Sequence, residues 1–259
     1  MRQFNLNDDD IFVLSSSSKG NQPKWFKDNY YIKADAMGYE SVAELVSYVF
    51  SVCINIKSVA YDLCVINGNI CGCYSKNILK PGESLITLDR IIKQYDRGIL
   101  QYYGSYDFID KVIILCSNVL NIDKRKLILY FSYMCKFDAI ILNEDRHLNN
   151  VAFIKSNNKY RLCSLFDNGM SLLSNQVWYN INDNIDELML KVRSATFSSN
   201  FDEQCRYFND LPKIKVDLNK LVAKLGVLNA PFKYVEFQRA ITVLFKRLQQ
   251  TKGVYWVEV

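Results

Sequence analysis

The sequence predicts an α+β protein in which a small, strand-rich part precedes a larger, mostly helical part. Two observations predict this division. Up to about residue 75, short β-prone runs between turn residues surround one amphipathic segment, which is typical of a small sheet with a single helix. After the Lys-Pro-Gly break at 80–82, apolar residues recur mostly at helical spacing. We therefore predict an N-terminal lobe over residues 1–78 and a C-terminal lobe over residues 79–259.

Composition places the chain among ordinary globular proteins. Of its 259 residues, 49% are hydrophobic and 23% are charged, with a net charge of +5 spread along the chain. That balance excludes a disordered chain, and the scattered charge does not indicate nucleic-acid binding. No apolar run is long enough to span a bilayer, residues 1–10 lack a secretory pattern, and the eight cysteines form no CxxC pair. We expect a cytoplasmic protein with reduced cysteines, no membrane and no direct nucleic-acid partner.

The first elements form a strand, a loop and a hairpin. Residues 11–14 are expected to be a short strand, and residues 15–24 a loop of small and turn-forming side chains. The aromatic and β-branched residues over 25–33 flank Asp28 and Asn29, which predicts a hairpin with its turn at those two residues.

A helix and a second hairpin complete the predicted N-terminal lobe. The helix over 41–53 places its apolar residues on one face, and Ser41 with Glu44 matches a capping box. Strands over 59–66 and 70–74 are separated by Asn-Gly-Asn, a strong hairpin signal.

The C-terminal lobe contains one strongly predicted helix. It runs over 124–142, has an apolar face and can be capped by Asp123. Two short strands over 151–155 and 160–165 follow, and amphipathic helical segments are expected from about residue 184 on.

The stretch Asn-Glu-Asp-Arg-His-Leu-Asn-Asn, from Asn143 to Asn150, directly follows this helix and indicates chemistry. Asp145 can accept a proton from an attacking hydroxyl or orient that hydroxyl. The amide oxygen of Asn150 and the carboxylate of Asp167 can hold Mg²⁺ bound to nucleotide phosphates. His147 is the only histidine in the chain. The spacing predicts a site for metal-assisted phosphotransfer.

The N-terminal lobe offers the complementary half of such a site. A loop of small residues can present backbone N–H groups to phosphates. Lys33, on the next strand, offers a point charge, and Glu44 on the following helix can hold the lysine stem in place. Glu44 also has the competing local role of completing the capping box. This order of parts is that of a two-lobed kinase.

These residues resemble the motifs of the HipA-like serine/threonine kinases, whose protein-kinase-like fold is shared with the phosphoinositide kinases. The family pattern Asn-x-Asp-x-His-x-x-Asn matches at Asn143, Asp145, His147 and Asn150, and the family's metal-binding aspartate falls on Asp167.

The resemblance extends upstream and downstream. Gly20, Gln22 and Lys24 match a Gly-x-Gln-x-Lys loop, Tyr31-Ile32-Lys33 resembles the strand of the ATP lysine, and residues 195–203 resemble a segment of the helical lobe. The chain begins almost at the phosphate loop, so we expect the family's extra N-terminal subdomain to be absent or supplied by another protein.

The resemblance implies a role for each matched residue. Asp145 is the catalytic base or hydroxyl-orienting acid, Asn150 and Asp167 bind Mg²⁺, and Lys33 contacts the α- and β-phosphates of ATP. His147 orders the catalytic stretch rather than transferring protons. The expected nucleotide-binding residues are Lys33, Glu44, Ser17, Gly20, Gln22, Lys24, Lys76 and Ile78, the last two beside the adenine.

Two further residues, Asp138 and Ser17, have expected roles, and Arg146 has none. Asp138 lies on an apolar helix face, so we expect it to order the catalytic stretch by hydrogen bonding. Ser17 lies where some family members carry a self-phosphorylated serine, with Ser15, Ser16 or Ser18 as alternatives. A phosphate there would add about −1.5 to −2 charges to the phosphate loop and inhibit the enzyme.

The resemblance implies an ATP- and Mg²⁺-dependent serine/threonine protein kinase, toxin-like in action. Its substrate would be a protein such as an aminoacyl-tRNA synthetase or another translation component. Its partner would be an antitoxin or a separate protein equivalent to the N-terminal subdomain. Two alternatives stay open: a lipid kinase of the phosphoinositide type, and a nucleotide-binding pseudokinase that acts through a partner.

Overall fold

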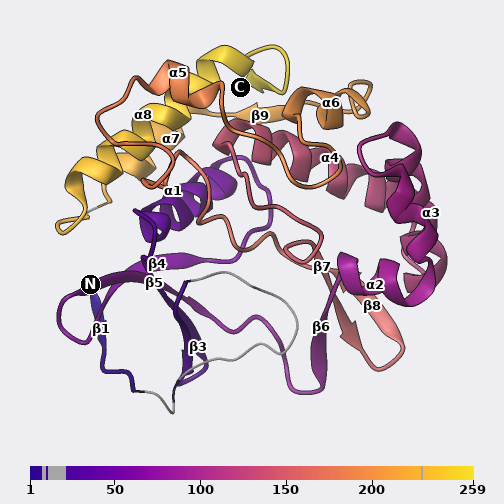
Figure 1. The fold of residues 1–259 in the computed structure, drawn as a ribbon, viewed down its shortest axis with the longest axis horizontal. Helices are drawn as coiled ribbons and strands as arrows, with labels where there is room; N and C mark the ends of the chain where they lie inside the picture. Colours follow the sequence, from indigo (N-terminus) through magenta and orange to yellow (C-terminus); the bar gives the residue numbers. More distant parts are fainter. Residues whose placement is uncertain (8–9, 11–21, 229) are drawn as a thin grey trace.

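The computed structural model describes residues 1–7, 10, 22–228 and 230–259. It confirms the mixed α+β architecture, with a curled five-stranded sheet at the N-terminal end and a helical C-terminal region (Figure 1). The strand predicted over 11–14 and the phosphate-loop residues Ser17 and Gly20 lie outside the described residues.

The N-terminal sheet has the strand order β1-β4-β5-β3-β2. Its first strand pairs in parallel with β4, and the other neighbouring strands are antiparallel. The sequence did not predict β1, because three residues are too few for a periodic pattern. The strands are β1 (Arg2–Phe4), β2 (Lys24–Lys27), β3 (Tyr30–Ala34), β4 (Tyr61–Ile66) and β5 (Ile70–Lys76).

Both predicted hairpin turns are confirmed. Asp28 and Asn29, between β2 and β3, have φ angles of 50° and 65°. Asn67 and Gly68, between β4 and β5, have φ angles of 49° and 83°. Positive φ at both central residues matches the right-handed twist of the flanking strands, and Asn, Asp and Gly adopt it at low cost.

Helix α1 (Glu40–Cys53) packs on β4 and β5 and also contacts helices of the C-terminal region. The predicted capping box at its start is wrong. Ser41 donates its backbone N–H and its hydroxyl to the two carboxylate oxygens of Asp35, at 2.7 and 2.8 Å. Glu44 instead turns into the interior, where a buried lysine needs a counter-charge.

A second, three-stranded sheet has the order β6-β7-β8. Its hairpin β7 (Ala152–Ser156) and β8 (Lys159–Leu162) matches the prediction. Strand β6 (Glu83–Thr87) is not among the strands that the sequence predicted. Its partner β7 lies more than sixty residues later, as Ser84↔Lys155 shows, and such pairing leaves no local signature.

Helix α4 (Lys124–Ile141) forms the centre of the helical region and is largely buried. Asp123 caps it as predicted, because its carboxylate accepts the N–H of Lys126 at 3.0 Å. Phe137 of α4 stacks on Phe50 of α1 with ring centroids 5.8 Å apart, so the two helices share one core.

The remaining elements of the described chain complete the C-terminal region. Strands β9 and β10 pair in parallel. The elements are α2 (Leu88–Tyr95), the 3₁₀ helix η2 (Arg97–Tyr102), α3 (Tyr106–Leu120), α5 (Ile185–Met189), α6 (Phe201–Arg206), α7 (Leu218–Gly226), α8 (Tyr234–Thr251), β9 (Ile214–Val216) and β10 (Trp256–Glu258).

The division into lobes at residue 78 stays a prediction. It falls between β5 and β6, but α1 contacts α7 and α8 as well as the first sheet. Among the described residues, no helix is long and apolar enough to cross a membrane.

Candidate active site

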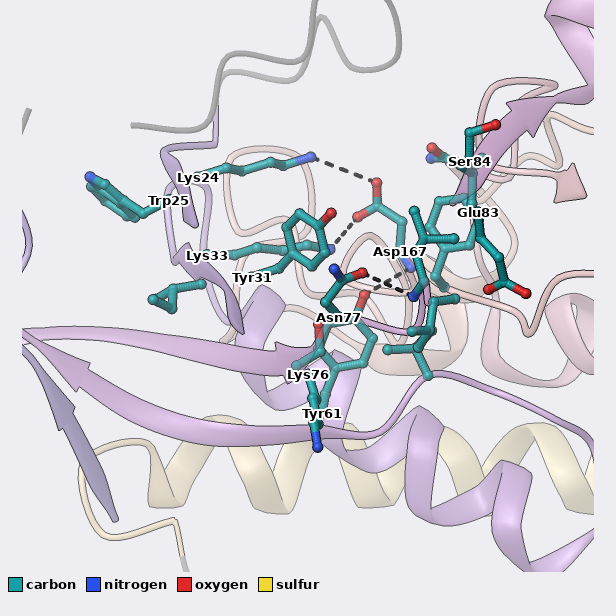
Figure 2. Close-up of a pocket in the computed structure, with 18 residues that line it drawn as sticks. Lys24, Trp25, Tyr31, Lys33, Tyr61, Lys76, Asn77, Glu83, Ser84 and Asp167 are labelled. Carbon is teal, nitrogen blue, oxygen red and sulfur yellow. Dashed lines mark hydrogen bonds and ion pairs between the residues drawn. The ribbon is translucent and has the colours of Figure 1, made fainter. Parts of the chain in front are cut away.

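A cavity of about 410 Å³ lies between the first sheet and β6. Figure 2 shows Lys24, Lys33 and Tyr61 reaching toward Asp167 from the sheet side, with Glu83 and Ser84 on the opposite wall. The cavity therefore brings together side chains from both sequence regions that were expected to form one site.

Lys33 is the penultimate residue of β3 and is 8% exposed. Its Nζ is 2.8 Å from Oε1 of Glu44 and 2.6 Å from Oδ1 of Asp167. Burial alone would lower the pKa of Lys33, but the charges of Asp167 and Glu44 outweigh it and hold that pKa well above its ordinary value. Lys33 is therefore a charged ammonium group at the inner end of the cavity.

Glu44 binds both halves of the site. Besides the ion pair to Lys33, its Oε2 accepts the backbone N–H of Asn168 at 2.9 Å. The side chain is fully buried. Helix α1 thus fixes both the lysine on β3 and the segment that carries Asp167.

Asp167 adopts the left-handed conformation, with φ of 58°. Its Oδ2 lies 3.7 Å from Nζ of Lys24, and its backbone N–H donates to the hydroxyl of Tyr61 at 3.4 Å. Burial opposes ionisation, but Lys33 and Lys24 lower the pKa of Asp167 well below its ordinary value. Asp167 is therefore a carboxylate at any physiological pH.

The stretch from Asn143 to Asn150 begins where α4 ends, with Leu142 in the left-handed conformation. Asn150 Nδ2 donates to the carbonyl of Asp145 at 2.8 Å and lies 3.4 Å from its Oδ2. The Asp145 side chain is 45% exposed. Burial raises the pKa of Asp145, and His147 opposes that effect. The carboxylate of Asp145 thus keeps solvent access while its backbone carbonyl is held by Asn150.

His147 lies beside Asp145 and not within the cavity. Its Nδ1 accepts the backbone N–H of Asn149 at 3.2 Å, and its Nε2 is 3.6 Å from Oδ1 of Asp145. These contacts join the imidazole to the backbone and the carboxylate of the same stretch.

Asp138 has the contacts that were expected of it. One carboxylate oxygen accepts from Nδ2 of Asn143 at 3.2 Å, and both accept from the guanidinium of Arg146. Arg146 also donates to Asn150 O at 3.2 Å, to Phe166 O and to Oδ1 of Asn168. The network holds the 143–150 stretch against the segment of Asp167.

Of the other predicted residues that the structure describes, three line the cavity and one does not. Lys24, Lys76 and Ile78 line it, and Ile78 packs with Phe166 on two small apolar clusters, which suits a flat ring. Gln22 precedes β2 and is not among the described lining residues.

Sequence reasoning missed Tyr61, Arg146 and Thr196. The Lys33 ammonium lies 5.0 Å from the ring centroid of Tyr61, and Thr196 donates its hydroxyl to Arg146 O at 2.8 Å. For two of them the sequence offered a signal. Tyr61 lies within the strand predicted over 59–66, and Thr196 lies in the 195–203 segment already noted.

The donor set fits Mg²⁺. Asp167 supplies a carboxylate, and the Asn150 amide nitrogen is taken by Asp145. No described residue donates a hydrogen bond to Asn150 Oδ1, so it can act as a ligand. Magnesium is commonly held by one or two protein oxygens plus phosphate oxygens and water.

Comparison with known proteins supports the fold. No protein-family model and no curated protein matches the chain. The crystal structure of the Helicobacter pylori proinflammatory kinase CtkA is similar, with a TM-score of 0.71 and 19% identity over 96% of this chain and 94% of that one. A chain of the Shewanella oneidensis MR-1 complex of HipA, HipB and operator DNA gives a TM-score of 0.55 and 11% identity, over 94% of this chain and 66% of that one. This protein therefore has a HipA-like kinase fold.

Proposed function

We propose that this protein is an ATP- and Mg²⁺-dependent kinase that phosphorylates a serine or threonine hydroxyl of another protein. The observation that carries the proposal is the ion-pair chain Glu44–Lys33–Asp167, which joins the two halves of the site at the inner end of the cavity. The kinase-like fold supports it.

Charge and shape support the proposal that the first cavity binds a nucleotide. Two carboxylates keep Lys33 positively charged, and its ammonium group can also contact the α- and β-phosphates. Lys24 is a second cation on the same wall. The apolar surface at Ile78 and Phe166 suits the adenine ring.

Asp167 and Asn150 would hold Mg²⁺, which supplies charge neutralisation for the phosphates when bound. Asp167 offers an ionised carboxylate because its neighbours lower its pKa. Its position also depends on Tyr61 and on Arg146, which contacts the segment on both sides of it.

Asp145 would orient the acceptor hydroxyl and receive its proton. The half-exposed carboxylate can reach a group from solvent, while Asn150 holds its backbone. Phosphoryl transfer leaves little covalent chemistry to the protein. Most of the rate enhancement would therefore come from positioning and charge stabilisation.

The test is a phosphotransfer assay with radiolabelled ATP and Mg²⁺ on the protein alone and on a cell lysate. Wild type should transfer phosphate to protein. Asp145→Asn should bind ATP but lose transfer, and Asp167→Asn should lose Mg²⁺-dependent transfer. Asp62→Asn, on the exposed position of β4, is the matched control and should be fully active.

Two outcomes would contradict the proposal. Transfer to phosphoinositide vesicles but not to protein would make the enzyme a lipid kinase. ATP binding without transfer to any acceptor would make it a pseudokinase.

The biological setting is a separate part of the proposal. A structure of the toxin–antitoxin pair HipA and HipB is similar in fold, and on that likeness we propose a toxin-like kinase with an antitoxin-like protein partner. A translation component, such as an aminoacyl-tRNA synthetase, is the substrate to test first. Phosphoproteomics after brief expression of wild type and Asp145→Asn tests this directly.

A further inference from the structure

A second cavity, which the proposed phosphotransfer does not use, lies behind the segment that leads to Asp167. Its volume is about 760 Å³, compared with about 410 Å³ for the first cavity. Its walls come from the loop after α1, the start of α4, and β8 with the residues that follow it. Cavities of this size hold organic ligands.

Three tyrosines, Tyr130, Tyr133 and Tyr160, give this cavity its chemistry. All three line it and are partly exposed. Among the described residues, none of their hydroxyls has a hydrogen-bond partner. Each ring offers a flat apolar face and each hydroxyl a donor, so the walls suit an aromatic ligand that carries acceptor atoms.

The charges on the lining are mostly positive. Lys57 and Lys126 are exposed, and neither forms an ion pair with a carboxylate of the described chain. Arg161, the third cation, is paired with Glu83 at 2.9 Å. Asp123 is the one carboxylate among the described lining residues, and it accepts the backbone N–H of Lys126 in the first turn of α4. The two lysines therefore favour an anion.

The two cavities lie at opposite ends of one paired stretch. Leu165 donates its N–H to Lys57 O at 2.9 Å and accepts from the N–H of Val59 at 2.7 Å. Two residues further along each of these two segments, the backbone N–H of Asp167 donates to the hydroxyl of Tyr61. A ligand that shifts Leu165 would therefore also move the metal-binding carboxylate.

We propose that the second cavity binds a small organic anion with an aromatic body, and that its occupancy changes the affinity of the first cavity for the Mg²⁺–nucleotide. The binding statement stands on the cavity alone. The coupling statement rests on the proposed function, because it requires nucleotide in the first cavity.

The probe is 8-anilinonaphthalene-1-sulfonate, an aromatic anion that fluoresces when bound, titrated with and without saturating ADP and Mg²⁺. Wild type should bind one probe molecule in both conditions. The double variant Lys57→Glu with Lys126→Glu should raise the dissociation constant about tenfold or more through charge repulsion. Lys124→Glu is the matched control, since Lys124 is exposed on the same helical turn but does not line the cavity.

Mutual effects test the coupling. Increasing ADP with Mg²⁺ should change the dissociation constant of the probe by about fivefold or more and then reach a plateau. The probe should change the dissociation constant of ADP by the same factor. Equal binding by the double variant and wild type, or displacement by ADP without a plateau, would overturn the site. Probe binding with no mutual effect would overturn the coupling. Failure to bind ADP at all would count against the proposed function, while the lysine variants still test the cavity.

Discussion

Arg146 and Asp138 form a two-point ion pair in the protein interior, with Nε to Oδ2 at 3.0 Å and Nη2 to Oδ1 at 3.2 Å. Both side chains are essentially inaccessible to solvent. The remaining donors of Arg146 reach Asn150 O, Phe166 O and Asn168. One guanidinium therefore joins α4, the catalytic stretch and the segment of Asp167.

Arg146→Met should lower the free energy of unfolding by about 3–5 kcal/mol, because it leaves the Asp138 carboxylate buried without its partner. Urea unfolding followed by circular dichroism measures the change. Arg125→Met, at an exposed position near the start of α4, is the control and should change stability by less than about 0.5 kcal/mol. A loss below about 1 kcal/mol for Arg146→Met would show that the pair is not important for stability.

Glu44→Gln should weaken ATP binding more than it slows transfer of bound phosphate, because it releases Lys33 from one of its two carboxylates. We expect the dissociation constant of ATP to rise by about tenfold, the cost of one charge-assisted contact. Calorimetric titration with ATP measures it, and Ser41→Ala on the same helix is the control. An unchanged affinity would mean that Glu44 serves only the backbone of Asn168.

Tyr61→Phe keeps the ring against Lys33 but removes the acceptor for the N–H of Asp167. Loss of one neutral hydrogen bond corresponds to about a two- to twelvefold effect, which we expect in the Mg²⁺ concentration that gives half-maximal activity. Tyr74→Phe removes a hydroxyl that reaches Asp62 at the sheet surface and should leave Mg²⁺ dependence unchanged. Equal behaviour of the two variants would contradict the role given to Tyr61.

The stabilising effect of Asp167 should depend on pH in a known direction. Its pKa in the folded protein lies below the ordinary value of 3.8, so the folded state favours the ionised form. The stabilisation is then fully present above the unfolded pKa and is lost as pH falls through the folded value. Unfolding of wild type and Asp167→Asn between about pH 7 and 2.5 should show a difference that stays constant down to about pH 5 and then shrinks. A difference that grows toward acid would contradict the ion-pair geometry.

Self-phosphorylation of Ser17, or of Ser15, Ser16 or Ser18, stays a prediction from the sequence. A phosphate there should inhibit ATP binding, because it adds about −1.5 to −2 charges to the loop that the sequence predicts to bind the phosphates. Mass spectrometry of ATP-treated wild type, with Asp145→Asn as the negative control, measures it. Absence of phosphate from residues 15–18 would rule it out.

Local pattern predicted what depends on neighbours in sequence. Both hairpin turns and the capped helix α4 follow from residues within one or two turns of chain. Strand β6 and the capping box show the opposite case. Strand β6 depends on a partner far along the chain. Glu44 does not cap its helix as predicted, because its carboxylate is the counter-charge of the buried Lys33.

Sequence alone was enough to predict two hairpin turns, helix α4 and the chemical types at Asp145, Asn150 and Asp167, because spacing and side-chain chemistry are local properties. Tertiary structure alone decided which charges meet. Lys33 pairs with Asp167 across 134 residues of sequence, and Arg146 found its partners only when α4 and the catalytic stretch were packed together. Burial makes an unpaired charge costly, so packing selects partners that no sequence pattern records.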